Sequence, residues 1–215
     1  MISIKEHLLL YAVTDRSWTN SQTLEEQVEE AIEGGITLLQ LREKDVSPTF
    51  FHQEATSILQ LCKKHQVPLI INDDVDIALN INADGVHVGQ DDLNAKEVRQ
   101  IIGEEMILGV SCQNVEQAIK AENDGADYLG VGAVFTTTTK DDAQNTSLET
   151  LKNICQAVSI PVVAIGGIKE SNISKLHNSG IAGVAIVSDI FGATNIKQKV
   201  NTLLAVTKEM LTNEG

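Results

Sequence analysis

The chain has 215 residues, of which 42% are hydrophobic and 21% charged, as expected for a globular protein with one sizeable core. Its 30 acidic and 16 basic side chains give a net charge of -14, and only Arg16, Arg42 and Arg99 are arginines. A surface this acidic repels phosphate backbones and anionic lipid, which argues against a nucleic-acid-binding or membrane-surface protein.

The N-terminal region predicts no export. It has no basic start followed by a long apolar stretch and a small-residue cleavage site, so we expect no signal peptide. No segment has the roughly 20 apolar residues of a spanning helix. Cys62, Cys112 and Cys155 are odd in number and far apart, which indicates reduced thiols and a cytoplasmic protein.

Short, continuous apolar runs recur along the chain and predict buried parallel strands. In chain order, the predicted strands are residues 8–13, 36–41, 68–71, 85–88, 107–110, 128–131, 161–165 and 183–187.

Segments with apolar residues at helical spacing alternate with these runs, and several end at a glycine that can cap a helix. In chain order, the predicted helices are residues 23–33, 47–65, 74–80, 95–102, 115–123, 148–158, 172–178 and 196–211.

Eight strand–helix units of about 27 residues each predict an α/β fold, a (β/α)8 TIM barrel formed as a single domain over residues 1–215. An open, doubly wound parallel sheet is the alternative that the same alternation leaves open. No linker or shift in composition marks a domain boundary. In such a barrel the functional site lies at the carboxyl ends of the strands.

Two cations end the strand predicted at residues 36–41. One residue separates Arg42 from Lys44, so both can face one side of an extended strand while Glu43 faces the other. Arginine offers phosphate a bidentate fork and lysine a point charge. The spacing fits a phosphate contact and a surface ion pair with Glu43 or Asp45 equally well.

Carboxylates follow the next two strands. Asp73 and Asp92 come after the strands predicted at residues 68–71 and 85–88. Two carboxylates at adjacent strand ends suit Mg²⁺, which keeps several waters and takes phosphate oxygens as further ligands. Helix N-capping is a sufficient explanation for Asp74 and Asp91. The pairing across strands favours a metal role for Asp73 and Asp92.

Two other strand ends have the composition of phosphate sites. A glycine pair ends at Gly167, and Val187 and Ser188 lie at the end of the last strand; many barrels bind phosphate there with backbone N–H groups and a short helix. Four threonines, residues 136–139, precede Lys140 after the sixth strand. By itself, this threonine run is interpreted as a solvated loop.

The histidines and thiols predict no nucleophile. His87 lies within a predicted strand and is interpreted as a core histidine. Cys112 is interpreted as strand-end packing, because the sequence places no histidine beside it. No Ser–His–Asp or Cys–His arrangement and no cluster of metal-binding histidines emerges from the sequence.

An ordered set of short motifs indicates a family. The segments are residues 11–15, 40–44, 72–73, 84–92, 109–111, 125–128, 137–143, 164–168 and 183–188. Each is weak alone, but together they span nearly the whole chain and resemble thiamine-phosphate synthase. The resemblance implies a Mg²⁺-dependent transferase that joins 4-amino-2-methyl-5-hydroxymethylpyrimidine pyrophosphate to 4-methyl-5-(2-phosphooxyethyl)thiazole, or its carboxylated form, and releases pyrophosphate.

The resemblance also implies roles for individual residues. Contacts to the pyrimidine pyrophosphate are implied for Gln40, Leu41, Arg42, Glu43, Lys44, Asn72 and Lys140, with Ser111 near the pyrimidine. The thiazole phosphate is implied to contact Thr137, Thr138, Thr139, Gly167, Val187 and Ser188. Asp73 and Asp92 are implied to bind Mg²⁺. The residues expected to act in catalysis are Arg42, Lys44, Ser111 and Lys140.

These residues are compatible with a dissociative substitution, in which the electron-rich aminopyrimidine expels pyrophosphate and the thiazole nitrogen attacks the resulting cation. The alternatives are a thiazole tautomerase of the same fold, a non-catalytic thiamine-precursor binder and another phosphate-binding barrel enzyme. The synthase is favoured over the tautomerase by Asp73, Asp92, Arg42 and Lys140, with Ser111 in place of a candidate histidine. The expected partners are the two small substrates, without nucleic acid or membrane, and the sequence leaves a homo-oligomer open.

Overall fold

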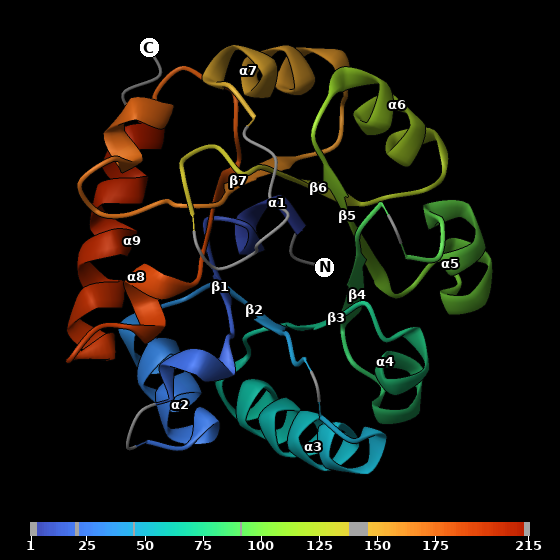
Figure 1. Ribbon diagram of the computed structural model, residues 1–215, viewed down its shortest axis with the longest axis vertical. Coiled ribbons are helices and arrows are strands. Elements are labelled where there is room, and N and C mark those ends of the chain that lie inside the picture. The colour runs from blue at the N-terminus through green and yellow to red at the C-terminus, as the bar shows by residue number, and fades with distance from the viewer. Residues whose placement is uncertain (1–3, 20–21, 45, 91, 138–145, 213–215) are drawn as a thin grey trace.

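The computed structural model describes residues 4–19, 22–44, 46–90, 92–137 and 146–212. Eight parallel strands close into a barrel in chain order, and helices surround the ring (Figure 1). The strands are β1 (Leu10–Val13), β2 (Leu38–Leu41), β3 (Leu69–Asn72), β4 (Gly85–Val88), β5 (Ile107–Cys112), β6 (Tyr128–Val131), β7 (Val162–Ile165) and β8 (Gly183–Ile186). The ring closes where Leu10 of β1 pairs with Val184 of β8. The predicted (β/α)8 barrel is confirmed, and the open sheet is excluded.

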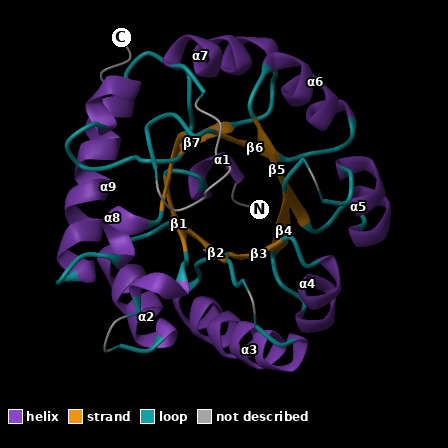
Figure 2. Cartoon of the chain, in the orientation of Figure 1, coloured by secondary structure: helices purple, strands orange, loops and turns teal. Residues whose placement is uncertain are grey.

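The helices are α1 (Ile4–His7), α2 (Leu24–Gly34), α3 (Pro48–His65), α4 (Val75–Ile81), α5 (Ala95–Ile102), α6 (Val115–Asn123), α7 (Leu148–Ala157), α8 (Ser188–Phe191) and α9 (Ile196–Thr212), with 3-10 turns η1 (Arg16–Trp18) and η2 (Ile173–Leu176). Helix α1 precedes β1, and the other helices follow strands on the outside of the ring (Figure 2). Among the described residues, no helix is long and apolar enough to cross a membrane.

Polar residues begin most of these helices, because a side-chain oxygen there accepts an otherwise unpaired backbone N–H. The residues that precede a helix and accept such a bond are Thr23, Ser47, Asp74, Asn94, Asn114, Ser147 and Asn195. Thr23 also forms a capping box with Glu26. Caps of this kind stabilise a helix by about 1 kcal/mol each.

The segment predicted as a helix at residues 172–178 is the short 3-10 turn η2 instead. The Asn172 side chain does not cap it. Its Oδ1 accepts from the Lys169 N–H at 2.8 Å, and its Nδ2 donates to the Gly167 carbonyl at 2.9 Å. Asn172 therefore stabilises the loop after β7 rather than a new helix.

Alternation along each strand divides the core into two layers. One set of side chains packs outward against the helices, and the other fills the barrel around Tyr11, Ile70 and Tyr128. Ile4 of α1 packs against this inner cluster, and α1 lies within the ring in the view of Figure 2. The strand ends with the predicted site residues therefore surround the mouth of a filled barrel.

Candidate active site

Three predicted site residues are the last inward-facing side chains of their strands. Gln40, Asn72 and Ser111 each lie two positions beyond an inward residue of β2, β3 and β5, and they lie at the same rim because all the strands of the closed barrel run parallel. Leu41 alternates to the opposite side and is fully buried in the outer layer. Only its backbone can contribute to a site at the mouth.

Asp73 and Asp92 are brought together after β3 and β4. The Asp73 N–H donates to the His87 carbonyl at 2.8 Å, and Asp92 Oδ2 accepts from the Gly89 N–H at 2.7 Å. The two carboxyl groups are close enough for the Asp92 charge to act on Asp73. Partial burial, followed by the Asp92 charge, raises the pKa of Asp73 to about 6.

This carboxylate pair fits a hard divalent cation, because such a cation takes oxygen ligands. Its charge would also offset the repulsion between the two carboxylates. In the described part of the chain, no group of three or more His, Cys, Asp or Glu side chains is placed to hold a metal. A cation at Asp73 and Asp92 would therefore take water or substrate oxygens as its other ligands. A cavity of about 500 Å³ adjoins Asp73 and is also lined by Asp76 of α4.

The cations after β2 differ in their surroundings. The Arg42 side chain is 15% exposed, and its Nη1 lies 4.0 Å from Asp15 Oδ2. Its charge also acts on the Asp73 carboxyl group and lowers the pKa of that group. Lys44 is exposed. Arg42 is thus held between the ends of β1 and β3, whereas Lys44 extends into solvent.

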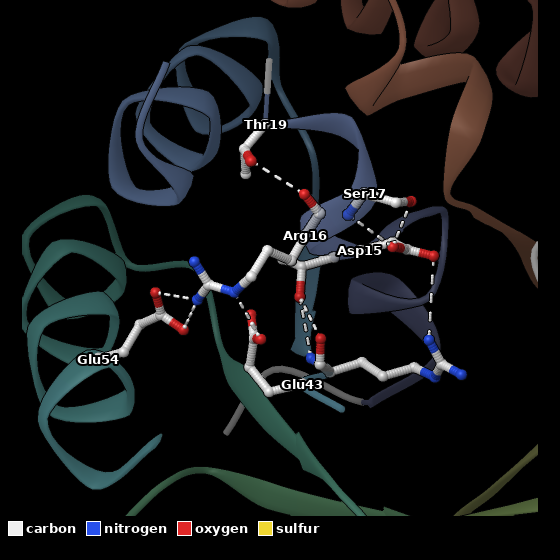
Figure 3. Close-up of polar contacts among 8 residues, drawn as sticks. Asp15, Arg16, Ser17, Thr19, Glu43 and Glu54 are labelled. Atoms are coloured by element: carbon white, nitrogen blue, oxygen red, sulfur yellow. Dashed lines mark hydrogen bonds and ion pairs between the residues drawn. The ribbon is translucent and has the colours of Figure 1, made fainter. Parts of the chain in front are cut away.

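Glu43 lies outside the barrel mouth, in an ion-pair network (Figure 3). Arg16 of η1 donates to Glu43 Oε2 at 2.9 Å and to Glu54 of α3 at 2.6 Å. The Glu43 carboxylate has no exposed surface, and burial raises its pKa while Arg16 opposes that rise. Any effect of Glu43 on a substrate therefore goes through the position of its neighbours in the chain.

The two strand ends predicted to bind phosphate, at Gly167 and at Val187 and Ser188, lie in adjacent loops. Ile165 of β7 pairs with Ala185 of β8, which brings the following Gly167 and Val187 to neighbouring strand ends. Gly167 has φ +63°, and within the described residues its N–H donates to no acceptor. Ser188 begins α8, where a helix leaves its first N–H groups unpaired.

The threonine loop is described only in part. Thr136 and Thr137 lie within the described residues, and a side chain added at Gly167 would overlap the Thr136 carbonyl, so the loops after β6 and β7 pack closely. Thr138, Thr139 and Lys140 lie outside the described residues.

Sequence reasoning missed the groups inside the barrel. His87 is 7% exposed, its Nε2 lies 2.9 Å from Ser111 Oγ, and its Nδ1 lies 2.9 Å from the Tyr128 hydroxyl. Thus a serine does lie beside a histidine, but the third group is a tyrosine, not a carboxylate. The signal was the alternation that turns His87, Ser111 and Tyr128 inward on three neighbouring strands.

The Cys112 side chain turns outward from the barrel. It is 1% exposed, and burial raises the pKa of its thiol to about 12. A thiol in that state is a packing group rather than a nucleophile.

Comparisons with known proteins agree over the full length of the barrel. A family model described as "Thiamine monophosphate synthase" matches residues 10–190. The thiamine-phosphate synthase of Clostridium tetani is 53% identical over 200 residues, covering 93% of this chain and 96% of that protein. That of Ruminiclostridium cellulolyticum is 54% identical over 197 residues, covering 92% and 94%. A solved structure, the thiamine phosphate pyrophosphorylase from Pyrococcus furiosus, matches with a TM-score of 0.90 and 35% identity. The match covers 97% of this chain and 100% of that one.

Proposed function

Because the chain belongs to the thiamine monophosphate synthase family, and is thus a transferase that forms thiamine phosphate, we propose that it works with Mg²⁺ held by Asp73 and Asp92 and without a protein nucleophile. The substrates are small molecules. They are 4-amino-2-methyl-5-hydroxymethylpyrimidine pyrophosphate and the thiazole phosphate or its carboxylated form, and pyrophosphate leaves.

The observation that carries the metal proposal is the approach of the Asp73 and Asp92 carboxyl groups at adjacent strand ends. Mg²⁺ bound there would offset negative charge on the leaving pyrophosphate. Arg42, which lies near Asp15 and whose charge acts on Asp73, would bind a pyrophosphate oxygen through its guanidinium. Lys44 and Lys140 are proposed to supply further positive charge to that group.

Other polar groups at the barrel mouth are proposed to hold the pyrimidine ring and the thiazole phosphate. Gln40, Asn72 and Ser111 surround the mouth and would orient the pyrimidine. The backbone N–H groups of Gly167 and Ser188 would bind the thiazole phosphate.

Further groups are proposed to support these contacts. Val187 and the three threonines Thr137, Thr138 and Thr139 would complete the thiazole phosphate site. Leu41 and Glu43 would contribute through the backbone that carries Arg42 and Lys44. All of these groups follow the strands of one barrel, so we propose that this single barrel, residues 1–215, is the catalytic unit.

The proposed chemistry is dissociative. The aminopyrimidine stabilises the cation left when pyrophosphate departs, and the thiazole nitrogen attacks it. The protein would act by positioning and by neutralising developing charge. Cys62 and Cys112 are buried free thiols, which supports the proposal of a cytoplasmic enzyme.

One assay tests the proposal: purified protein is mixed with both substrates, with Mg²⁺ or with a chelator, and thiamine phosphate and pyrophosphate are measured. We expect both products in equal amounts, and only with Mg²⁺. Pyrophosphate release from the pyrimidine substrate alone would indicate a hydrolase. Equal rates with the chelator would contradict the metal proposal.

A further inference from the structure

A chain of buried hydrogen bonds crosses the interior of the barrel and has both ends near the mouth. Gln40 Nε2 donates to the Tyr11 hydroxyl at 2.6 Å, and that hydroxyl lies 2.8 Å from the Tyr128 hydroxyl. The Tyr128 hydroxyl lies 2.9 Å from His87 Nδ1, and His87 Nε2 lies 2.9 Å from Ser111 Oγ. We call these five residues the interior relay.

The barrel is built to hold this relay. A side chain at Gly109 would overlap both the Tyr128 ring and His87 Nδ1, and one at Gly130 would lie 3.1 Å from His87 Cε1. Tyr11 and Tyr128 are 1% and 0% exposed, so water does not replace their partners. A buried hydroxyl hydrogen without an acceptor is destabilising.

The donor at one end fixes the direction of the whole relay. An amide NH₂ only donates, so the Tyr11 hydroxyl accepts from Gln40 and has one hydrogen left to give. Its neighbour is the Tyr128 hydroxyl, which in turn has His87 Nδ1 as its next partner. In the opposite direction, the Tyr11 hydroxyl would receive two donors, and its own hydrogen would be buried with no acceptor among these groups.

We propose that Tyr11, Tyr128 and His87 are positioning residues that hold the His87 ring as the neutral Nε2–H tautomer, so that Ser111 accepts from His87 and gives its own hydrogen to a pyrimidine ring nitrogen. The proposal rests on the proposed function for the identity of the substrate. It gives Ser111 the role of a hydrogen-bond donor. A serine nucleophile needs the reverse, with Nε2 unprotonated and accepting from the hydroxyl.

The tautomer can be observed directly, without any assay of activity. Two-bond ¹H–¹⁵N correlation spectra of the ¹⁵N-labelled full chain at pH 8 report which ring nitrogen carries hydrogen, and the His87 signals are those that disappear in His87→Gln. We expect hydrogen on Nε2 and none on Nδ1. Tyr128→Phe removes the hydroxyl that donates to Nδ1 and should let the Nδ1–H tautomer appear. An Nδ1–H or doubly protonated ring in the unmodified protein would overturn the proposal.

Kinetics test whether His87 acts through Ser111. In His87→Gln the amide nitrogen falls near the position of Nε2 and can still donate to Ser111, so kcat should stay within about threefold. In His87→Asn the amide ends near Nδ1, and kcat should fall about tenfold, the effect of one hydrogen bond. Introduced into Ser111→Ala, His87→Asn should have less than about a twofold further effect.

A tenfold loss from His87→Asn in the Ser111→Ala background would contradict action through Ser111. The matched control is His177→Asn, because His177 lies far from the mouth and its Nδ1 contacts the Met210 carbonyl; this variant should keep full activity. If the protein formed no thiamine phosphate, the proposed function would fail while the spectra still tested the relay. An Nδ1–H ring in an active protein would overturn the relay alone.

Discussion

Arg42 is the arginine that the fold leaves at the barrel mouth. Arg99 donates to the carbonyls of Gly125, Gly103 and Met106 and pairs with Asp127, which ties β5 and β6 to the end of α5. Arg16 is held by two glutamates. Two of the three arginines are therefore structural.

Replacing Arg42 by alanine should weaken binding of the pyrimidine pyrophosphate. A hydrogen bond to a charged group contributes about 1.5–3 kcal/mol, so we expect KM to rise by roughly ten- to a hundredfold. Steady-state kinetics at saturating thiazole phosphate measure the change. Lys63→Ala, which removes one positive charge from the end of α3, is the control and should leave KM unchanged. An unchanged KM in Arg42→Ala would mean that the pyrophosphate lies elsewhere.

The sequence predicts groups at strand ends better than groups inside the barrel. Asp73 and Asp92 were identified because adjacent parallel strands bring their following residues together. His87 was interpreted as a core residue because alternation gives the side a residue faces but not what it meets there. Its partners, Tyr128 and Ser111, come from other strands, and the register that joins them is a property of the closed barrel.

At the scale of elements, Arg16 links η1, the end of β2 and α3. It lies between Glu43 and Glu54, so without it two carboxylates face each other, one of them buried (Figure 3). We expect Arg16→Gln to lower the free energy of unfolding by about 1–3 kcal/mol at pH 8, measured by urea denaturation.

This loss should shrink as the pH falls. Burial holds the pKa of Glu43 above its usual range in the folded protein, and the loss of Arg16 raises that pKa further. A carboxyl group with a raised folded pKa binds its proton more tightly in the folded state, so folding gains stability as pH falls through that pKa. Adding Glu54→Gln should recover part of the stability at pH 8. A deficit that grows toward acid pH would contradict this account of the cluster.

Two glycines, Gly109 of β5 and Gly130 of β6, leave room inside the barrel for the His87 and Tyr128 side chains. Gly109→Ala would force its methyl group into Tyr128 and His87, and we expect a loss of about 1–3 kcal/mol of stability together with a lower kcat. Gly130→Ala meets only the edge of the His87 ring at 3.1 Å and should have a smaller effect. If Gly109→Ala and Gly130→Ala changed the thermal denaturation midpoint and kcat by the same amounts, the interior relay would not depend on the close approach at Gly109.

Most helices could be predicted from the sequence because the residues that begin and end a helix act on nearby backbone groups. The N-cap side chains and the glycine after α2, with φ +101°, act within one turn of the chain. One exception is residues 172–178, where Asn172 bonds to Gly167 and Lys169 instead of capping a helix. These bonds depend on the conformation of the loop after β7, which the spacing of apolar residues does not predict.

At the scale of the whole molecule, the net charge of -14 opposes an anionic substrate, and the barrel mouth must offset it locally. Arg42 provides a cation near Asp73, and the Asp73–Asp92 carboxylate pair would attract a second cation. The account therefore depends most on the metal, since without it this pair would repel pyrophosphate.

The Mg²⁺ dependence of Asp73→Asn tests this central claim most directly. Turnover is measured at saturating substrates over a range of Mg²⁺ concentrations, with Asp76→Asn as a control that removes the same charge from the wall of the adjoining cavity. We predict that Asp76→Asn matches the unmodified protein. Asp73→Asn should need at least about tenfold more Mg²⁺ and reach a lower maximum rate. Superimposable Mg²⁺ curves for Asp73→Asn and the unmodified protein would contradict the account.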